Sequence, residues 1–420
     1  MRIPSALSMD GGPEMDVEIR VQTSGLPYPV RVGPGILTEL PRLLAEEAPA
    51  HRYVLVGDER VMELHGDQVA RSLAGSGAGG AQQATSPLGK VSTREAGSTS
   101  KTPPNLKRTA AQRPTVTLDR LTFPAGEEHK TREEWARLTD QVLELGVGRD
   151  GCIIALGGGV TGDLAGFVAA TYMRGIPVVQ LPTSLVAMVD SSVGGKTGVD
   201  LPGGKNLVGA FHPPRFVLAD TRLARTLPPE ERSQGLAEAV KHGAIVDAGY
   251  MDRIVSSASS LLAGDEAETA WMVARSVEIK AWVVSRDERE GGLRQILNFG
   301  HTLGHALEAV SGYTLPHGSA VGIGMVLEAR LGEALGVSRP GTSEQVARAV
   351  EAVGLPTVPP PGSRDSDHFM EHLGRDKKAR GGRPRFVLLE EVGRIHKGDE
   401  GSESWSHPVP PEAIREVLQG

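Results

Sequence analysis

Three histidines and one glutamate in the second half of the chain have the residue types of a metal site. His301 and His305 lie four positions apart in LNFGHTLGHALE, which places both imidazoles on one face of a helix. His317 follows in LPHGSAVGIGM, and Glu238 lies upstream in LAEAVKHG. Histidines with a carboxylate form a usual zinc ligand set, and an open fourth position would make the site catalytic. The spacing favours His301 with His305 as ligands; the alternative is that these histidines cap helices or make ordinary polar contacts.

Several cationic and amide side chains precede the histidine segment. Lys241 lies three residues after the glutamate, and Lys280, Arg294 and Asn298 come shortly before the first histidine. Lysine and arginine bind carboxylate and phosphate groups. These residues would give the second half of the chain its own donors for an anionic, hydroxylated substrate beside the metal.

A second candidate site is a glycine turn in the first half of the chain. The apolar run Cys152–Leu156 is typical of a buried strand, Gly157–Gly159 follow it, and Thr161–Asp163 lead into an apolar helical stretch. Glycine lets backbone N–H groups approach a pyrophosphate, and a helix N-terminus adds partial positive charge. The run does not fit the dinucleotide spacing G-x-G-x-x-G at every place, nor the P-loop. A tight strand-to-helix turn without a ligand is the alternative.

A charged, glycine-rich loop follows this turn. Asp190, Lys196, Lys205 and Asn206 lie among glycines between the apolar runs IPVVQL and RFVLAD. These charged and amide side chains are not typical of a hydrophobic core. A small polyhydroxylated anion would bind the lysines through its charge, and it would bind Asp and Asn through its hydroxyls. A solvated flexible loop is the alternative, but a predicted strand at each end favours a binding loop.

The elements that must position these residues alternate along the first half of the chain. From Val17 to Asp220, strand and helix patterns follow one another, which is typical of a parallel sheet with crossover helices. Ligands of such sheets bind at the carboxyl ends of the strands, where the glycine turn lies. Asp58 comes directly after the predicted strand Tyr53–Val56, where it would bind ribose hydroxyls, cap the next helix, or do both.

The pattern becomes helical after Thr226, and a strand in RFVLLEEVG precedes a final helix in PPEAIREVLQ. The predicted architecture is a Rossmann-like, dinucleotide-binding α/β domain over residues 16–227. An all-α, metal- and substrate-binding domain would follow over residues 228–420, with the substrate in a cleft between the two.

Two segments are predicted to be disordered. Residues 1–15 form a predicted tail. Residues 75–114 are rich in Gly, Ser, Thr, Pro and Ala and have almost no large apolar side chains, so they cannot bury enough surface to order themselves. We interpret them as a low-complexity insertion within the first domain.

The composition excludes several classes of protein. The 420 residues have a formal net charge of −7, 39% hydrophobic and 4% aromatic residues, and one cysteine, Cys152. The chain therefore lacks the basic field and stacking surfaces of nucleic-acid-binding proteins, and no apolar run reaches the length of a membrane span. The first residues lack the apolar core of a secretory signal, and one cysteine cannot form an internal disulfide. We expect a cytoplasmic enzyme without nucleic-acid or membrane partners.

Six stretches resemble the 3-dehydroquinate synthase family and occur in the family's order. They are GGGVTGDLAGFVAATYMRG, LPTSLVAMVDSSVGGKTGVD, GKNLVGAFHPP, LAEAVKHG, LNFGHTLGHALE and HGSAVGIGM. The resemblance covers roughly residues 15–395 apart from the insertion. It implies NAD, one divalent metal (zinc or cobalt) and a homodimer. The implied reaction converts 3-deoxy-D-arabino-heptulosonate 7-phosphate into 3-dehydroquinate and phosphate.

The resemblance also implies roles for individual residues. It assigns the metal to Glu238, His301 and His317, in place of the pair that spacing favours, and makes His305 a contact of the substrate phosphate. The other catalytic and substrate-binding candidates are Lys196, Asn206, Lys241, Lys280, Arg294, Asn298 and one of the adjacent Lys377 and Lys378, with Arg174 supplied across a dimer interface. The implied NAD contacts are Gly158, Gly159 and Asp163 at the pyrophosphate, Asp58, Glu127 and Lys130 at the adenosine, and Thr183, Ser184, Asp190, Lys205 and Thr226 elsewhere.

The implied mechanism is a transient oxidation. NAD accepts a hydride from C5 while the metal holds the C4 and C5 hydroxyls. The substrate's own phosphate takes the C6 proton and leaves, the hydride returns, and the ring closes by an intramolecular aldol reaction. Two alternatives stay open. One is another sugar phosphate cyclase, acting on sedoheptulose 7-phosphate or glucose 6-phosphate, whose substrate would lack the carboxylate that Lys280 and Arg294, with Lys196, favour. The other is a metal- and NAD-dependent polyol dehydrogenase, which would release NADH.

Overall fold

The computed structural model describes residues 16–74, 91–95, 116–202, 204–363, 366–374, 384–398 and 404–419, and these fall into two compact units. The N-terminal unit comprises Asp16–Arg20 and Pro27–Thr226. The C-terminal unit comprises Val21–Leu26 and Leu227–Gly420. Within the described ranges, no helix is long and apolar enough to cross a membrane.

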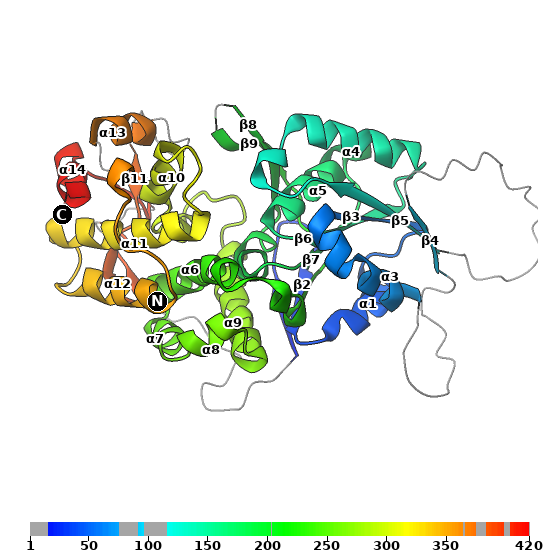
Figure 1. Ribbon diagram of the computed structural model, residues 1–420, viewed down its shortest axis with the longest axis horizontal. Coiled ribbons are helices and arrows are strands. Elements are labelled where there is room, and N and C mark those ends of the chain that lie inside the picture. Colours follow the sequence, from blue (N-terminus) through cyan, green and yellow to red (C-terminus); the bar gives the residue numbers. More distant parts are fainter. Residues whose placement is uncertain are drawn as a thin grey trace, which may run out of the picture. The chain divides into compact units, whose positions relative to one another are not determined.

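An eight-stranded sheet forms the centre of the N-terminal unit (Figure 1), with the order β1-β2-β10-β7-β6-β3-β5-β4. The pairings from β2 to β4 are parallel, as predicted. The inner strands β3, β6 and β7 are buried almost throughout, which is why each is a nearly continuous apolar run. The strands are β1 (Val17–Val21), β2 (Tyr28–Gly33), β3 (Arg52–Asp58), β4 (Val91–Glu95), β5 (Val116–Phe123), β6 (Gly151–Gly157), β7 (Val178–Pro182) and β10 (Val217–Asp220).

Helices cover both faces of this sheet, and the alternation of side chains along β3 shows how. Tyr53 and Leu55 pack with the apolar sides of α1 (Leu40–Glu47) and α3 (Asp67–Ala74). Val54 and Val56 point to the opposite face and pack with α4 (Arg132–Glu144) and α5 (Gly159–Thr171). Each inner strand therefore contributes to two separate hydrophobic cores.

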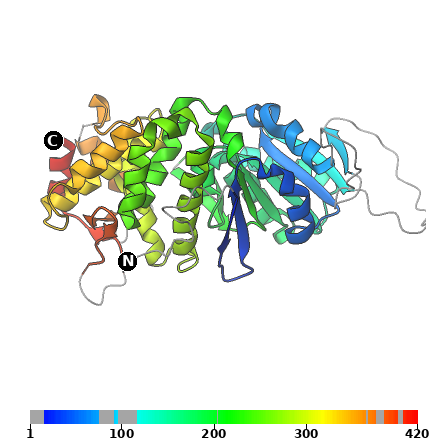
Figure 2. The ribbon, with the colours of Figure 1, turned by 90° about the horizontal axis from the view of Figure 1, so that it is seen from below.

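Part of the segment predicted to be disordered is an edge strand. Residues 91–95 form β4, which pairs in parallel with β5 from Val91↔Val116 to Glu95↔Arg120. Backbone pairing at a sheet edge needs few large apolar side chains, so composition alone did not indicate this strand. Figure 2 shows β4 in cyan and the β1–β2 strands in dark blue at the two edges of the sheet. The rest of residues 75–114 lies outside the described ranges.

The predicted charged loop is largely an antiparallel ribbon. β8 (Lys196–Leu201) pairs with β9 (Gly204–Phe211) in a register that runs from Lys196↔Phe211 to Leu201↔Gly204. Two glycines allow the strands to approach: a Cβ on Gly198 would lie 2.6 Å from the Val208 carbonyl oxygen, and one on Gly209 would lie 2.1 Å from that of Thr197. The glycines that suggested a loop therefore serve strand pairing.

Short helical segments connect these elements. They are η1 (Ile36–Glu39), α2 (Glu59–Val61), η2 (Met62–Gly66), η3 (Glu127–His129), η4 (Tyr172–Arg174), η5 (Ala187–Ser191) and η6 (Thr221–Thr226). Of these, η2 and η5 are single π-helical turns, a form that occurs frequently at functional sites.

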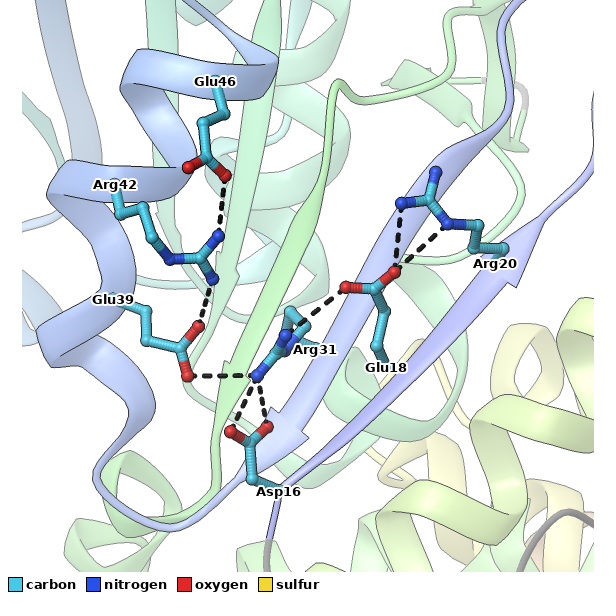
Figure 3. Close-up of polar contacts among 7 residues, drawn as sticks. All are labelled: Asp16, Glu18, Arg20, Arg31, Glu39, Arg42 and Glu46. Carbon is cyan, nitrogen blue, oxygen red and sulfur yellow. Dashed lines mark hydrogen bonds and ion pairs between the residues drawn. The ribbon is translucent and has the colours of Figure 1, made fainter.

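Ion pairs tie the β1–β2 edge to the helix that follows it (Figure 3). The Arg31 guanidinium of β2 lies 2.7 Å from Asp16, 3.1 Å from Glu39 and 3.3 Å from Glu18. Only 17% of the Arg31 side chain is exposed. Arg42 of α1 extends the network by bridging Glu39 to Glu46, and Arg20 of β1 binds Glu18 at its exposed end.

The C-terminal unit is mainly helical. Helices α10 and α11 pack closely because glycines lie between them: a Cβ on Gly324 would lie 2.0 Å from the Gly300 carbonyl oxygen, and one on Gly304 would lie 3.0 Å from that of Ala320. The helices are α6 (Pro229–Val246), α7 (Ala248–Ser256), α8 (Ala258–Ala263), α9 (Glu266–Val284), η7 (Leu293–Asn298), α10 (His301–Val310), α11 (His317–Ala334), α12 (Thr342–Ala352), η8 (Pro361–Ser363), α13 (Ser366–Gly374) and α14 (Pro411–Gln419).

The C-terminal unit is not all-α, since it also contains two small antiparallel sheets. One pairs β11 (Arg385–Phe386) with β14 (His407–Pro408), and the other pairs β12 (Leu389–Glu391) with β13 (Arg394–Ile395). The apolar residues Phe386 and Leu388 pack against α10 and α11, which explains why strand-forming residues occur here.

A segment from the beginning of the chain also belongs to the C-terminal unit. The Gln22 N–H donates to Ser285 Oγ at 2.9 Å, and the Ser24 N–H donates to a carboxylate oxygen of Glu288 at 2.6 Å. Residues Val21–Leu26 therefore lie against the end of α9, although the sequence places them far from it.

Candidate functional site

Three side chains from three helices of the C-terminal unit converge on a point. Glu238 lies in α6, His301 is the first residue of α10 and His317 is the first residue of α11. The Nε2 atom of each histidine lies 3.3 Å from the same Glu238 oxygen, Oε1, and the candidate ligand atoms all lie within 4.8 Å of one another. Two imidazoles and one carboxylate are the donor set of a catalytic zinc site with one position open, so these residues fit a divalent metal.

The electrostatics of this cluster suit a cation. Glu238 and Lys241 have side chains only 1% exposed, and they form an ion pair. Burial raises the pKa of the Glu238 carboxyl, but Lys241 and the two histidines outweigh burial and hold that pKa well below its usual range. Glu238 therefore stays an anion, which is the state that binds a metal.

The His317 imidazole lies between two carboxylates. Burial lowers its pKa, but hydrogen bonds to Glu238 and Glu308 raise the pKa to about 10. Its Nε2 atom faces Glu238 at 3.3 Å, and its Nδ1 atom faces Glu308 at 3.4 Å. Glu308 was not among the residues singled out from the sequence, although it lies three positions after His305 on the same helix face.

The start of α10 is held by another buried carboxylate that the sequence did not indicate. Glu328 of α11 accepts hydrogen bonds from the backbone N–H groups of Gly300 at 2.8 Å and Leu303 at 3.3 Å. These are N–H groups of a first helical turn, which have no partner within the helix. Glu328 thereby fixes the turn that contains His301. A buried glutamate within an apolar helix, GIGMVLEARL, was the available signal.

The predicted anion-binding residues of the C-terminal unit lie on neighbouring elements. Lys280 is buried in α9, and Arg294 is buried in η7, which packs against both α6 and α9. The Asn298 amide donates to Glu290 at 2.7 Å. His305 follows His301 by one helical turn, and their rings lie 5.3 Å apart in an edge-to-face arrangement. Lys377 and Lys378 lie outside the described residues.

In the N-terminal unit, the glycine turn joins β6 to α5. Gly158 is the N-cap of α5 and, having no side chain, makes no side-chain capping hydrogen bond. A Cβ on Gly158 would lie 3.2 Å from Ser184 Oγ, and one on Gly159 would lie 3.2 Å from Ser191 Oγ. The Thr183 N–H donates to the Gly157 carbonyl at 2.9 Å, which places the end of β7 beside the turn. A helix N-terminus that begins with glycines and has serine hydroxyls beside it suits a phosphate group.

One buried lysine joins three carboxylates near this turn. Lys130 lies 2.8 Å from Glu127, 3.3 Å from Asp163 and 3.6 Å from Asp200. Burial lowers the pKa of Lys130, but the three carboxylates raise it above its ordinary value. Lys205 reaches the same cluster, 3.8 Å from Glu127. Asp200 was not predicted; only its position in the ribbon brings it here.

The remaining candidates of this unit have varied surroundings. The Asp58 side chain accepts from the Val61 N–H at 2.9 Å, so its predicted capping role is confirmed. The Thr226 hydroxyl lies 3.1 Å from His65 Nε2. The Asn206 N–H donates to Asp200 at 2.7 Å, with the asparagine at a positive φ of 54°. Asp190 lies in η5, Lys196 is exposed at the start of β8, and Arg174 is exposed in η4 with a φ of 68°.

These features define a class of proteins in which an α/β domain of the dinucleotide-binding type is joined to a helical domain with a glutamate–histidine donor set. Within that class, the chain belongs to the 3-dehydroquinate synthase family. Residues 120–234 match the family model described as 3-dehydroquinate synthase N-terminal, and residues 235–379 match the corresponding C-terminal model.

Individual relatives agree with this assignment. The chain is 42% identical over 398 residues to the 3-dehydroquinate synthase of Xylella fastidiosa (strain M23), covering 93% of this chain and 95% of that one. It is 41% identical over 394 residues to that of Symbiobacterium thermophilum, covering 93% and 97%.

Two solved structures share the fold. A 2-deoxy-scyllo-inosose synthase complexed with carbaglucose-6-phosphate, NAD+ and Co2+ superposes with a TM-score of 0.77 at 24% identity, covering 96% of this chain and 99% of that one. A 2-epi-5-epi-valiolone synthase from Streptomyces hygroscopicus subsp. jinggangensis 5008, with NAD+ and Zn2+ bound, has a TM-score of 0.76 at 25% identity, covering 94% and 97%.

Proposed function

We propose that this protein is a 3-dehydroquinate synthase that converts 3-deoxy-D-arabino-heptulosonate 7-phosphate into 3-dehydroquinate and phosphate. The observation that carries the proposal is the convergence of Glu238, His301 and His317 from three helices in a chain of this family. Relatives that bear this name match more than nine-tenths of the chain.

The proposed cofactors are NAD and one divalent metal, zinc or cobalt. Two structures with the same fold hold NAD+ together with Co2+ or Zn2+. The metal would be held by Glu238, His301 and His317, and NAD by the glycine turn and the residues around Lys130. When bound, NAD supplies a reversible hydride acceptor and the metal supplies a Lewis acid for the substrate hydroxyls.

The chain's own residues would bind and orient the two anionic ends of the substrate. Lys280 and Arg294 are buried cations of the C-terminal unit, and they suit a substrate carboxylate, because lysine and arginine side chains bind carboxylate groups. We assign Lys196 and His305 to the phosphate. A phosphate held in place can take the neighbouring proton itself, so the chain need not supply a separate strong base.

This assignment separates the proposal from its nearest alternative. Cyclases that act on sedoheptulose 7-phosphate or glucose 6-phosphate receive a substrate without a carboxylate. Two buried cations outside the phosphate contacts would have no substrate anion to bind in such an enzyme. A polyol dehydrogenase of similar architecture is the second alternative, and it would release its reduced cofactor.

The phosphate-release assay tests all three readings. Each of the three sugar phosphates is added to the zinc-loaded protein, first with NAD in catalytic amount and then with NAD in excess over the substrate, while phosphate release and the absorbance of NADH are followed. Phosphate from the heptulosonate phosphate alone, without net NADH, supports the proposal. Turnover of one of the other phosphates would favour that cyclase, and NADH in proportion to the substrate consumed would favour the dehydrogenase.

We also propose a homodimer and a cytoplasmic location. Arg174 would contribute to the partner's site, and it suits that role because it is exposed in η4 beside the exposed Met173. The one cysteine, Cys152, is buried and free, which fits a reducing compartment. Sedimentation of the purified protein, together with the activity of Arg174→Ala, tests the dimer and this contact.

A further inference from the structure

Glu308 is a buried carboxylate beside the proposed metal ligands, and the proposed mechanism leaves it without a task. It lies in α10 and is only 3% exposed. A buried carboxylate is costly unless cations or hydrogen-bond donors surround it. The donors near Glu308 Oε2 include the imidazoles of His317, with Nδ1 at 3.4 Å, and His305, with Nε2 at 4.0 Å.

The His317 ring therefore has a carboxylate at each nitrogen. Nε2 points to Glu238, the proposed metal ligand, and Nδ1 points to Glu308. A neutral imidazole has one N–H and one lone pair. When a metal displaces the Nε2 proton, the hydrogen bond from Nδ1–H to Glu308 keeps the remaining proton on Nδ1 and leaves the lone pair on Nε2, directed at the point where Glu238 and His301 converge.

We propose that Glu308 is a positioning residue that fixes the tautomer and the ring orientation of His317, so that Nε2 is presented to the metal. The proposal rests on the metal site of the proposed function. It corresponds to the general arrangement in which a metal-binding histidine donates its second N–H to a carboxylate, and in which loss of that carboxylate costs about 10–100-fold in metal affinity.

A second reading of the same residues is that His305, Glu308 and His317 bind an ion of their own, since their ligand atoms also lie within 4.8 Å of one another. That reading requires His317 to bind a metal through Nδ1. Occupation of both clusters at once would require an imidazole deprotonated at both nitrogens. The positioning role needs only the neutral ring, and we therefore favour it.

The backbone supports this role, because α10 and α11 pack closely against each other. The two helices approach through Gly304 and Gly324, where any side chain would meet backbone atoms. Glu308 lies within α10 and His317 is the first residue of α11, so this packing places the carboxylate of one helix 3.4 Å from the imidazole of the other.

The test measures zinc binding directly, by competition with a chromophoric chelator, in the full-length protein without substrate. Glu308→Leu removes the acceptor and keeps most of the volume, and we expect about a 10–100-fold weaker zinc affinity. Glu308→Gln keeps a carbonyl oxygen that accepts the Nδ1–H, and it should recover most of the loss. Glu333→Leu is the matched control: this glutamate of α11 binds Ser343, and its loss should leave zinc affinity unchanged.

Each failure has a separate meaning. If wild-type protein binds no zinc, the metal site of the proposed function fails. If wild type binds zinc and the folded Leu variant binds it equally well, the positioning role is wrong and the metal site stands. Long-range 1H–15N correlation spectra of the zinc-loaded wild type decide the matter even if the Leu variant does not fold. His317, assigned with a His317→Asn variant, must carry its proton on Nδ1; a proton on Nε2 would overturn the proposal.

Discussion

The Lys130 ammonium lies 3.3 Å from the Asp163 carboxylate, and it also forms ion pairs with Glu127 at 2.8 Å and Asp200 at 3.6 Å. Burial raises the pKa of Asp163 to about 6 even though Lys130 opposes this shift, and the negative charges of Glu127 and Asp200 add to it. Three carboxylates thus compete for one buried cation, which makes this cluster sensitive to pH.

This cluster predicts a pH-dependent stability. A carboxyl whose pKa in the folded protein exceeds its ordinary value of 3.8 stabilises the fold at low pH, and the contribution is lost as the pH rises through about 6. We therefore expect the unfolding free energy of the wild type, relative to Asp163→Asn, to fall over that range, by about 3 kcal/mol at most. Urea unfolding at a series of pH values measures the difference. Asp140→Asn on the exposed side of α4 is the control and should show no such trend.

Removal of one proposed metal ligand should abolish metal binding. His301→Ala takes away one of the three donors and leaves Glu238 paired with Lys241. Loss of a residue that only orients a metal ligand costs up to ~100-fold in metal affinity, and we expect the loss of a ligand itself to cost more. Equilibrium dialysis with zinc measures this loss. His396→Ala, which changes a histidine of the small β12–β13 region, should bind zinc like the wild type. Full activity of metal-depleted His301→Ala would show that the metal assignment is wrong.

The close packing of α10 and α11 should not tolerate a methyl group. In Gly324→Ala the new Cβ would meet the Gly300 carbonyl oxygen at 2.0 Å, a contact with backbone that cannot move aside. We expect a loss of about 1–3 kcal/mol in unfolding free energy together with weaker zinc binding, because Gly300 directly precedes His301. At Gly362 a Cβ would meet nothing within 4 Å, so Gly362→Ala should leave both quantities almost unchanged.

The ion-pair network of Figure 3 predicts a difference between two arginines. Arg31→Gln removes a mostly buried guanidinium that faces Asp16, Glu18 and Glu39, and we expect it to cost about 1–3 kcal/mol, since the carboxylates lose their common partner. Arg20, 54% exposed, binds only Glu18 among these residues, and Arg20→Gln should change stability by less than ~0.5 kcal/mol. Thermal unfolding at low and high salt compares the two variants. Equal losses of stability in the two variants would mean that the ion pairs of Arg31 contribute no more to stability than those of an exposed arginine.

The sequence predicted the features that depend on neighbours along the chain. Strand β6, the glycine turn and α5 were predictable because apolar runs, glycine and helical periodicity are local signals. The side-by-side placement of His301 and His305 was predictable for the same reason. Helical spacing cannot show, however, that His317 and Glu238 approach His301 from other helices. Spacing alone therefore favoured His305, whereas the structure brings Glu238, His301 and His317 together.

Other parts depended on contacts that no local pattern contains. Asp200 approaches Lys130 only because β8 and β9 form a ribbon, and the glycines of that ribbon suggested a loop. β4 has no apolar composition to reveal it and is defined by its pairing with β5. Glu308 and Glu328 are ordinary helical residues until the packing of α10 on α11 gives them their partners.

The short segment Val21–Leu26 has a consequence for dissecting the molecule. Because it belongs with the C-terminal unit while the residues on either side belong with the other unit, the backbone changes unit twice before residue 30, at Val21 and at Pro27, and once more after Thr226. A C-terminal fragment that begins after Thr226 would therefore lack Val21–Leu26, the segment whose backbone donates hydrogen bonds to Ser285 and Glu288. We expect that fragment to be recovered poorly by itself, and better when the peptide covering Val21–Leu26 is co-expressed or fused to it.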